Sequence, residues 1–119
     1  MERAESEPTG PLSRVVVMDQ ELPGTLGVRR VEIRRITMAP GFSPGLHVHN
    51  GPVFGSVETG SVVYQIEGSP EVVLGPGDVF YEPEGTRIAR FDARAEGVTF
   101  LGYFLLADGV DAGLVFPER

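Results

Sequence analysis

The sequence predicts an all-β protein, and three features of the chain predict it. From Arg14 onward the apolar residues come in short runs that are rich in β-branched and aromatic side chains. Glycine and proline separate these runs at short intervals, and no stretch keeps a helical period for a dozen residues. Short strands joined by tight turns are typical of a sandwich or barrel built from two sheets.

The chain divides into a tail and one domain. Residues 1–13 combine Glu, Ser, Pro, Thr and Gly with few apolar side chains, so we expect a flexible N-terminal tail there. No linker separates a second hydrophobic block, so residues 14–119 are predicted to form a single β-barrel domain. The strands expected in this domain are 15–18, 28–38, 45–49, 53–58, 61–67, 71–74, 79–81, 87–92 and 98–107.

The expected strands differ in how they are covered. In 61–67, alternation places Val62, Tyr64 and Ile66 on one buried face. The strand 98–107 is apolar on both faces, which predicts that it is covered in the core or at an oligomer contact. Gly60 and Gly77 fall where tight turns between strands require a permissive backbone.

Composition narrows the chemistry. The formal charge is −7, the ten positive side chains are all Arg, and Cys is absent. A nucleic-acid partner is not expected, because such binding depends on clustered positive charge. Because Lys and Cys are both absent, the chain cannot use a Schiff-base lysine, a P-loop lysine or a thiolate, and we expect no organic cofactor. No apolar stretch is long enough to span a membrane, and a cytoplasmic location is predicted.

The densest run of positive charge lies in residues 29–35. It contains Arg29, Arg30, Arg34 and Arg35, with Glu32 in the middle. Strand alternation divides these side chains between two faces, so the run is interpreted as a solvated strand edge.

The only two histidines lie two residues apart, at His47 and His49. On a strand, both imidazoles would project to the same side, while Leu46 and Val48 face the other way. Converging imidazoles suggest a metal or acid–base site, although a hydrogen-bonded pair without a metal is the alternative.

Two glycine-containing motifs in residues 41–118 resemble those of the cupin superfamily. Gly41, His47, His49 and Gly60 match the spacing of the first cupin motif. The second motif is matched by Gly77, Pro83 and Gly85. The resemblance implies a single-domain double-stranded β-helix, also called a jelly-roll barrel, with its site inside.

The chain departs from both motifs at ligand positions. Where the family has a metal-binding glutamate this chain has Val53, and the histidine and asparagine of the second motif are replaced by Ile88 and Asp92. The resemblance therefore implies a degenerate metal site, because two imidazoles alone rarely hold a divalent ion.

Glu82 is the predicted substitute ligand. It lies just before Pro83, among aromatic residues. If it turns inward, His47, His49 and Glu82 form a two-histidine, one-carboxylate set suited to one divalent metal such as Zn, Fe, Mn or Ni. The alternative is that Glu82 faces solvent or pairs with Arg87. Glu58 and Asp92 are weaker candidates.

The same three residues, His47, His49 and Glu82, are the predicted catalytic groups. The side chains predicted to line the cavity and bind substrate are Phe54, Tyr64, Tyr81, Arg90 and Phe104, and Ile88 is expected beside them. Such a wall would be mostly apolar with a few polar groups.

The cupin resemblance implies an enzyme acting on a small molecule, of the isomerase, cyclase or lyase type. A metal-dependent dioxygenase is one alternative, and a non-catalytic ligand-binding barrel with a decayed metal site is the other. Apolar first and last strands also suggest a homodimer.

Overall fold

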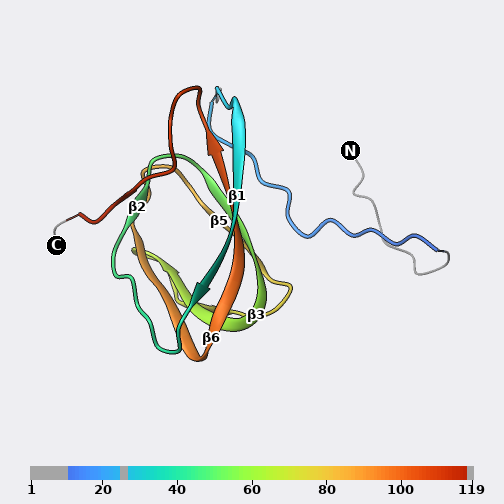
Figure 1. Ribbon diagram of the computed structural model, residues 1–119, viewed down its shortest axis with the longest axis vertical. Helices are drawn as coiled ribbons and strands as arrows, with labels where there is room; N and C mark the ends of the chain where they lie inside the picture. The colour runs from blue at the N-terminus through green and yellow to red at the C-terminus, as the bar shows by residue number, and fades with distance from the viewer. Residues whose placement is uncertain (1–10, 25–26, 118–119) are drawn as a thin grey trace.

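The structure is a computed structural model that describes residues 11–24 and 27–117. In this part of the chain every regular element is a strand (Figure 1). The strands are β1 (Arg30–Met38), β2 (Val48–His49), β3 (Val53–Ile66), β4 (Val72–Leu74), β5 (Val79–Glu82), β6 (Ile88–Leu106) and β7 (Leu114–Val115). The all-β prediction is confirmed.

Two long strands carry the fold. β3 and β6 pair antiparallel from Val53↔Phe104 at one end to Ile66↔Ile88 at the other. Three register shifts interrupt this ladder, and such bulges increase twist and bend a strand. Figure 1 shows both strands curving around the body of the molecule. One pair of strands therefore supplies much of the wall of the domain.

The remaining strands extend this wall. The large sheet has the order β1-β6-β3-β4, and β5 also pairs with β3. A second sheet consists of β2 and β7, and a bridge between His47 and Ile88 links it to the start of β6. The sheets form a jelly-roll of the double-stranded β-helix type without closing into a complete barrel.

The core lies on the inner face of the curved strands β3 and β6 and is rich in aromatic rings. Phe91 contacts Phe80 and Phe100 with ring centroids 5.1 Å and 4.8 Å apart. Val62 is fully buried, Tyr64 nearly so, and Ile66 packs partly buried against the same cluster, in agreement with the face predicted from the alternation of that strand. Inward residues of β3, β5 and β6 together form this cluster.

Gly60 lies inside a strand and not at a turn between two strands. Its φ is +76°, and a Cβ there would lie 2.0 Å from the carbonyl oxygen of Gly97. The expected strands 53–58 and 61–67 are therefore one bulged strand, β3. In the same way, 87–92 and 98–107 are joined in β6.

The ends of the chain differ from the sequence-based expectation as well. Residues 15–18 form no strand: they have no ladder partner among the described residues, and Val15, Val16 and Val17 are exposed. The expected strand 45–49 is reduced to β2, and β7 was not predicted. Residues 1–10 of the predicted tail lie outside the described residues. No helix in the described ranges is long and apolar enough to cross a membrane, and the cytoplasmic location stays a prediction.

Candidate metal centre

The two histidines are held in place by backbone pairing. The amide of His47 donates to the carbonyl of Ile88 at 3.1 Å, and the amide of Ile88 donates back at 2.8 Å. His49 pairs with Leu114 of β7. Because alternate residues of an extended chain face the same side, both rings point inward, with centroids 5.2 Å apart and planes at 88°.

Glu82 reaches the same place from the end of β5. It pairs with Val53 of β3, and its residue surface is only 2% exposed. Within β5, Phe80 and Glu82 are buried while Val79 and Tyr81 are more exposed, as alternation requires. The prediction that Glu82 turns inward agrees with the structure, and Glu82 forms no ion pair with Arg87, which pairs with Glu67 instead.

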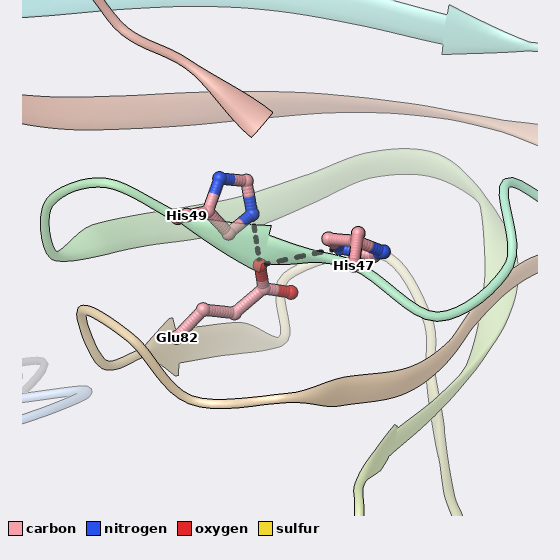
Figure 2. A group of neighbouring side chains, drawn as sticks. All are labelled: His47, His49 and Glu82. Atoms are coloured by element: carbon pink, nitrogen blue, oxygen red, sulfur yellow. Dashed lines mark ion pairs between the residues drawn. The ribbon is translucent and has the colours of Figure 1, made fainter. Parts of the chain in front are cut away.

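Figure 2 shows the carboxylate of Glu82 between the two imidazoles. Glu82 Oε1 lies 2.6 Å from His49 Nε2 and 3.9 Å from His47 Nε2. One ligand atom from each of the three residues lies within 4.8 Å of the others, so the group could hold a metal ion. Two histidines and one carboxylate are a donor set suited to first-row divalent metals, with positions left open.

A backbone hydrogen bond orients the ring of His47. Its Nδ1 lies 2.8 Å from the carbonyl oxygen of Gly45. A carbonyl only accepts, so Nδ1 carries the proton and donates it. The Nε2 of His47 is then the atom that faces Glu82, which is the arrangement that a metal-binding histidine needs.

The pKa values of His47 and Glu82 are both shifted by this arrangement. Burial raises the pKa of Glu82, but its interactions with His47 and His49 outweigh burial and lower the pKa below its usual range. Burial lowers the pKa of His47, yet the nearby Glu82 carboxylate and the hydrogen bond to Gly45 outweigh burial and raise the pKa. A buried carboxylate between two imidazoles is therefore stabilised in its charged form.

The site opens onto a cavity of about 340 Å³. Its wall is mainly apolar and aromatic, with the polar groups concentrated at the three site residues and at Arg34. The residues that line it are Arg34, Ile36, Met38, Pro44, His47, His49, Val53, Phe80, Glu82, Phe91, Phe100, Phe104, Ala112, Gly113 and Leu114. A hollow of this size and polarity suits a small organic ligand.

A family model described as a cupin domain matches residues 34–95, which is more than half of the chain and includes all three site residues. The chain belongs to the cupin family. No protein of curated function matches the sequence significantly.

Several solved structures share the fold at low identity. The DMSP lyase DddQ from Ruegeria pomeroyi is 22% identical, with a TM-score of 0.64 over 75% of this chain and 45% of that one. A cupin-like protein from Thermotoga maritima is 24% identical, with a TM-score of 0.62 over 71% and 64%. A double-stranded β-helix protein from Klebsiella pneumoniae is 18% identical, with a TM-score of 0.60 over 97% and 91%. The chain spans less than half the length of the DMSP lyases it matches.

The structure places the three residues at which this cupin departs from the family motifs. Val53 lines the cavity where the first motif has its glutamate, and Glu82 stands opposite it. Ile88 is fully buried, and its backbone pairs with that of His47 through two hydrogen bonds. Asp92 accepts a hydrogen bond from Ser43 and is not one of the three clustered ligands.

Phe104 is the one of the five predicted substrate-binding residues that lines the cavity. Phe54 and Tyr81 stack on each other at 4.8 Å, on the side of the sheet opposite to Val53 and Glu82. They do not line the cavity, because neighbouring residues on a strand face opposite sides.

Two further predicted wall residues lie elsewhere. Tyr64 is buried in the core, and its hydroxyl donates to the carbonyl of Tyr81 at 2.9 Å. Arg90 is exposed and pairs with Glu71 at 3.1 Å. Glu58, the weaker ligand candidate, pairs with Arg35 on the surface.

Sequence reasoning missed Arg34 as a cavity residue. It was grouped with a solvated strand edge, yet it lines the cavity together with Ile36 and Met38. These three are alternate residues of β1, so the two-residue period of the strand contained the signal.

Proposed function

We propose that this cupin is a metal-assisted enzyme acting on a small organic molecule, with His47, His49 and Glu82 as metal ligands and catalytic groups. One observation carries the proposal: three ligand atoms within 4.8 Å of one another lie at the wall of an apolar cavity. A cavity with convergent polar groups and shifted pKa values is the expected form of an active site.

The reaction class we favour is isomerisation, cyclisation or elimination. The solved structures that share the fold include DMSP lyases and the polyketide cyclase RemF from Streptomyces resistomycificus, which support non-redox chemistry. They also include an oxalate oxidase, which keeps an oxygen-dependent reaction as the alternative. Each of these shares less than 25% identity with this chain, so the reaction class is proposed.

The donor set fits a divalent metal, with Zn, Fe, Mn or Ni as the candidates. When bound, such an ion polarises a substrate oxygen and stabilises negative charge that develops on it. His47 and His49 would hold it through Nε2, and Glu82 would add one negative charge. Phe80, Phe91 and Phe100 add apolar surface to the wall of the same cavity, which would strengthen electrostatic interactions there by lowering the local dielectric constant.

Metal content tests this proposal directly. Elemental analysis of the full chain should find a divalent metal near one per protein, and His47→Ala and His49→Ala should each abolish it. Glu82→Gln should lower metal affinity by about tenfold or more, because loss of a ligand should exceed the roughly 10- to 100-fold effect of residues behind the ligands. Glu84→Gln is the matched control, since Glu84 is exposed two residues further along.

Three results separate the alternatives. A bound metal with substrate-dependent oxygen consumption would favour the dioxygenase. The decayed ligand-binding barrel would be favoured if the protein holds no metal and neither histidine variant alters the binding of a small molecule. The buried Ile88 is the feature that supports this alternative. Unchanged metal content in Glu82→Gln would remove Glu82 from the site.

We also propose that the cupin forms a homodimer through the outer face of its large sheet. Ile33, Tyr103, Phe54 and Tyr81 pair in one row across β1, β6, β3 and β5. They lie on the side opposite to the cavity, and Ile33 is 58% exposed. The row carries no charge, so a two-fold axis can place it against the same row of a second copy without repulsion.

A further inference from the structure

Arg34 contributes the one cationic side chain, apart from the histidines, to the wall of the cavity that the structure describes. It lies on β1, on the same face as Ile36 and Met38, and its partner across the ladder is Gly102 of β6. Because Gly102 has no side chain, the Phe104 ring fits over it; a Cβ there would lie 2.9 Å from that ring. The guanidinium carbon of Arg34 stands 5.1 Å from the centre of the same ring.

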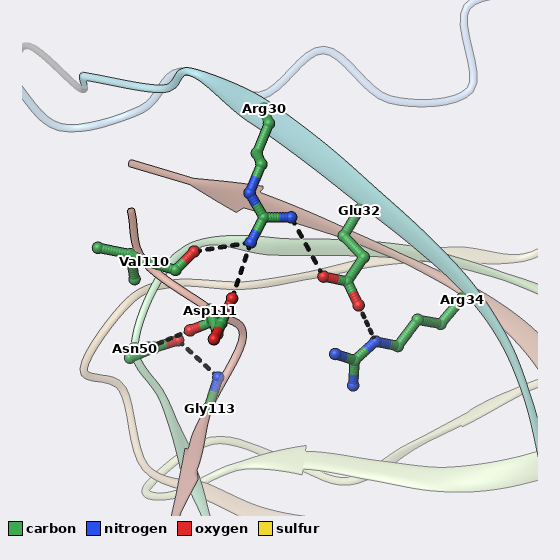
Figure 3. A network of polar contacts seen from close by, with 7 residues as sticks. All are labelled: Arg30, Glu32, Arg34, Asn50, Val110, Asp111 and Gly113. Atoms are coloured by element: carbon green, nitrogen blue, oxygen red, sulfur yellow. Dashed lines mark hydrogen bonds and ion pairs between the residues drawn. The ribbon is translucent and has the colours of Figure 1, made fainter. Parts of the chain in front are cut away.

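A row of charged side chains holds Arg34 in this position (Figure 3). Arg34 donates from Nε to Glu32 at 2.5 Å, and Glu32 also accepts from Arg30 at 3.4 Å. Arg30 in turn donates to the carbonyl of Val110 at 2.9 Å and to Asp111 at 3.1 Å. The hydrogen bond from Arg34 lowers the pKa of Glu32, which keeps this carboxylate charged and able to hold the guanidinium.

Arg34 is held through its Nε atom, and its two terminal nitrogens remain available to a ligand. Within the described residues the only side-chain hydrogen bond of Arg34 is the one from Nε to Glu32. Figure 3 shows the two terminal nitrogens directed away from Glu32. These nitrogens form the planar pair of donors that binds a carboxylate with two parallel hydrogen bonds.

Arg34 is also close enough to the metal centre to bind the same molecule. The Phe104 ring centre lies 5.1 Å from the guanidinium carbon and 6.1 Å from the centre of the His49 ring. The two groups are thus at most about 11 Å apart, with one aromatic ring between them. A small molecule could meet the histidines at one end and Arg34 at the other.

We infer that Arg34 is the specificity-determining residue of this cupin and that its substrate is a small organic acid whose carboxylate binds the two terminal nitrogens of Arg34. The inference rests on the proposed function for the reaction at the other end of the substrate. Glu82 adds a negative charge to the cavity, which disfavours anions in the metal-free site and is offset once a divalent ion is bound. The apolar wall would cover the hydrocarbon part of the acid.

The test compares one acid with its neutral counterpart. Binding of 4-fluorobenzoate and 4-fluorobenzamide to the full chain is measured by fluorine NMR, with zinc-loaded and metal-free protein in parallel. We expect 4-fluorobenzoate to bind more tightly than the amide. Arg34→Gln should lower the affinity for the acid by about tenfold or more, since hydrogen bonds to charged groups are among the stronger ones. It should change the affinity for the amide by less than about twofold. Arg34→Lys should retain part of the affinity for the acid.

Arg35→Gln is the matched control, because Arg35 is the next residue of β1, faces the other side and pairs with Glu58. It should bind both probes as the wild type does. The inference is overturned if Arg34→Gln binds the acid as well as wild type, if it weakens both probes equally, or if the wild type fails to bind 4-fluorobenzoate.

Metal content keeps this result separate from the proposed function. Arg34→Gln should contain as much metal as the wild type. If the metal is present but the acid is not preferred, the inference about Arg34 fails and the metal site stands. If the wild type holds no metal but prefers the acid through Arg34, the proposed metal chemistry fails and Arg34 remains an acid-binding residue.

Discussion

Glu82 stands directly opposite Val53 in the antiparallel pairing of β5 with β3. Paired residues of an antiparallel ladder project from the same face of the sheet, so a carboxylate from either position reaches the same cavity. The first cupin motif expects its glutamate at position 53, where this chain has valine. The carboxylate has in effect moved one strand across while the two histidines keep their places.

This relationship predicts that the carboxylate can be moved back. Glu82→Val should lower metal affinity by about tenfold or more through loss of a ligand. Adding Val53→Glu to that variant should recover at least part of the loss, because the new carboxylate projects into the same space. Metal affinity is measured by competition with a chromogenic chelator, and thermal unfolding confirms that each variant folds.

Val53→Glu alone serves as the comparison for this pair. It places a second carboxylate beside Glu82, and two adjacent carboxylates disfavour joint ionisation. A folded double variant that binds metal no better than Glu82→Val would show that position 53 cannot supply the ligand.

Metal affinity should rise with pH above about 6.5. The pKa of His47 is raised from its usual value of 6.5, so a proton competes with the metal at this ring over a range that extends above that value. The lowered pKa of Glu82 means that this carboxylate is already ionised there and adds no competition. Isothermal titration calorimetry in buffers of different ionisation enthalpy should detect proton release on binding. Affinity independent of pH between 6 and 8 would contradict the assignment of His47 as a ligand.

The folding stability of the metal-free protein should fall, not rise, as the pH increases above about 6.5. A raised pKa of His47 means that its stabilising contribution is complete below 6.5 and is lost as the pH rises through the folded-state pKa. A lowered pKa of Glu82 means that its contribution is complete above 4.5 and is lost as the pH falls through its own folded-state pKa. The pair therefore stabilises the metal-free fold most between about 4.5 and 6.5. Denaturant unfolding of the chelator-treated protein across and on both sides of this range tests the prediction. In His47→Gln the free energy of unfolding should fall less as the pH rises above 6.5.

The sequence predicted the centre of the site better than its walls. His47, His49 and Glu82 could be named because unusual residue types in a motif position are visible in the sequence. The residues that form the walls are set by the alternation of side chains along each strand, because adjacent residues of one strand cannot both face inward. Since Glu82 faces the cavity, Tyr81 faces away, and since Val53 faces it, Phe54 does not.

Strand lengths and distant pairings were harder to predict for a related reason. Gly60 and Gly97 have positive φ values and look like turn residues in the sequence, yet both lie within long strands. A glycine bulge and a glycine turn place the same residue type in the same local conformation, and only the partner strand distinguishes them. Alternation groups Arg34 with Ile36 and Met38 on one face of β1, but which face of β1 lies inward depends on how β1 pairs with β6.

Ile33→Glu should prevent the proposed self-association. Ile33 is the exposed end of the row that continues through Tyr103, Phe54 and Tyr81, and a two-fold contact would bring two introduced charges into an apolar interface. Sedimentation velocity should show a dimer for wild type and a monomer for the variant. Arg14→Glu is the control, since Arg14 lies in the exposed segment before β1. A monomeric wild type at micromolar concentration would rule out the dimer.

Gly55→Ala should destabilise the protein by about 1–3 kcal/mol, the usual cost of overpacking a core. Gly55 pairs with Phe80 across the β3–β5 ladder, and a Cβ on Gly55 would lie 2.0 Å from the ring of Phe80. The ring has to move, and Phe80 is two residues from Glu82 on the same face of β5. We therefore expect lower metal affinity together with the lower midpoint of thermal unfolding.

A double-mutant cycle with Phe80→Leu identifies the contact as the cause. If the clash with the ring is responsible, the two substitutions together should cost less than the sum of their separate effects, since the smaller side chain leaves room for the methyl group. Gly75→Ala is the control, because a Cβ there meets nothing within 4 Å. Additive effects in the cycle would place the cost of Gly55→Ala elsewhere in β3. Sub-additive effects, with metal affinity partly regained in the double variant, would show that the position of the Phe80 ring determines how Glu82 is presented to the histidines.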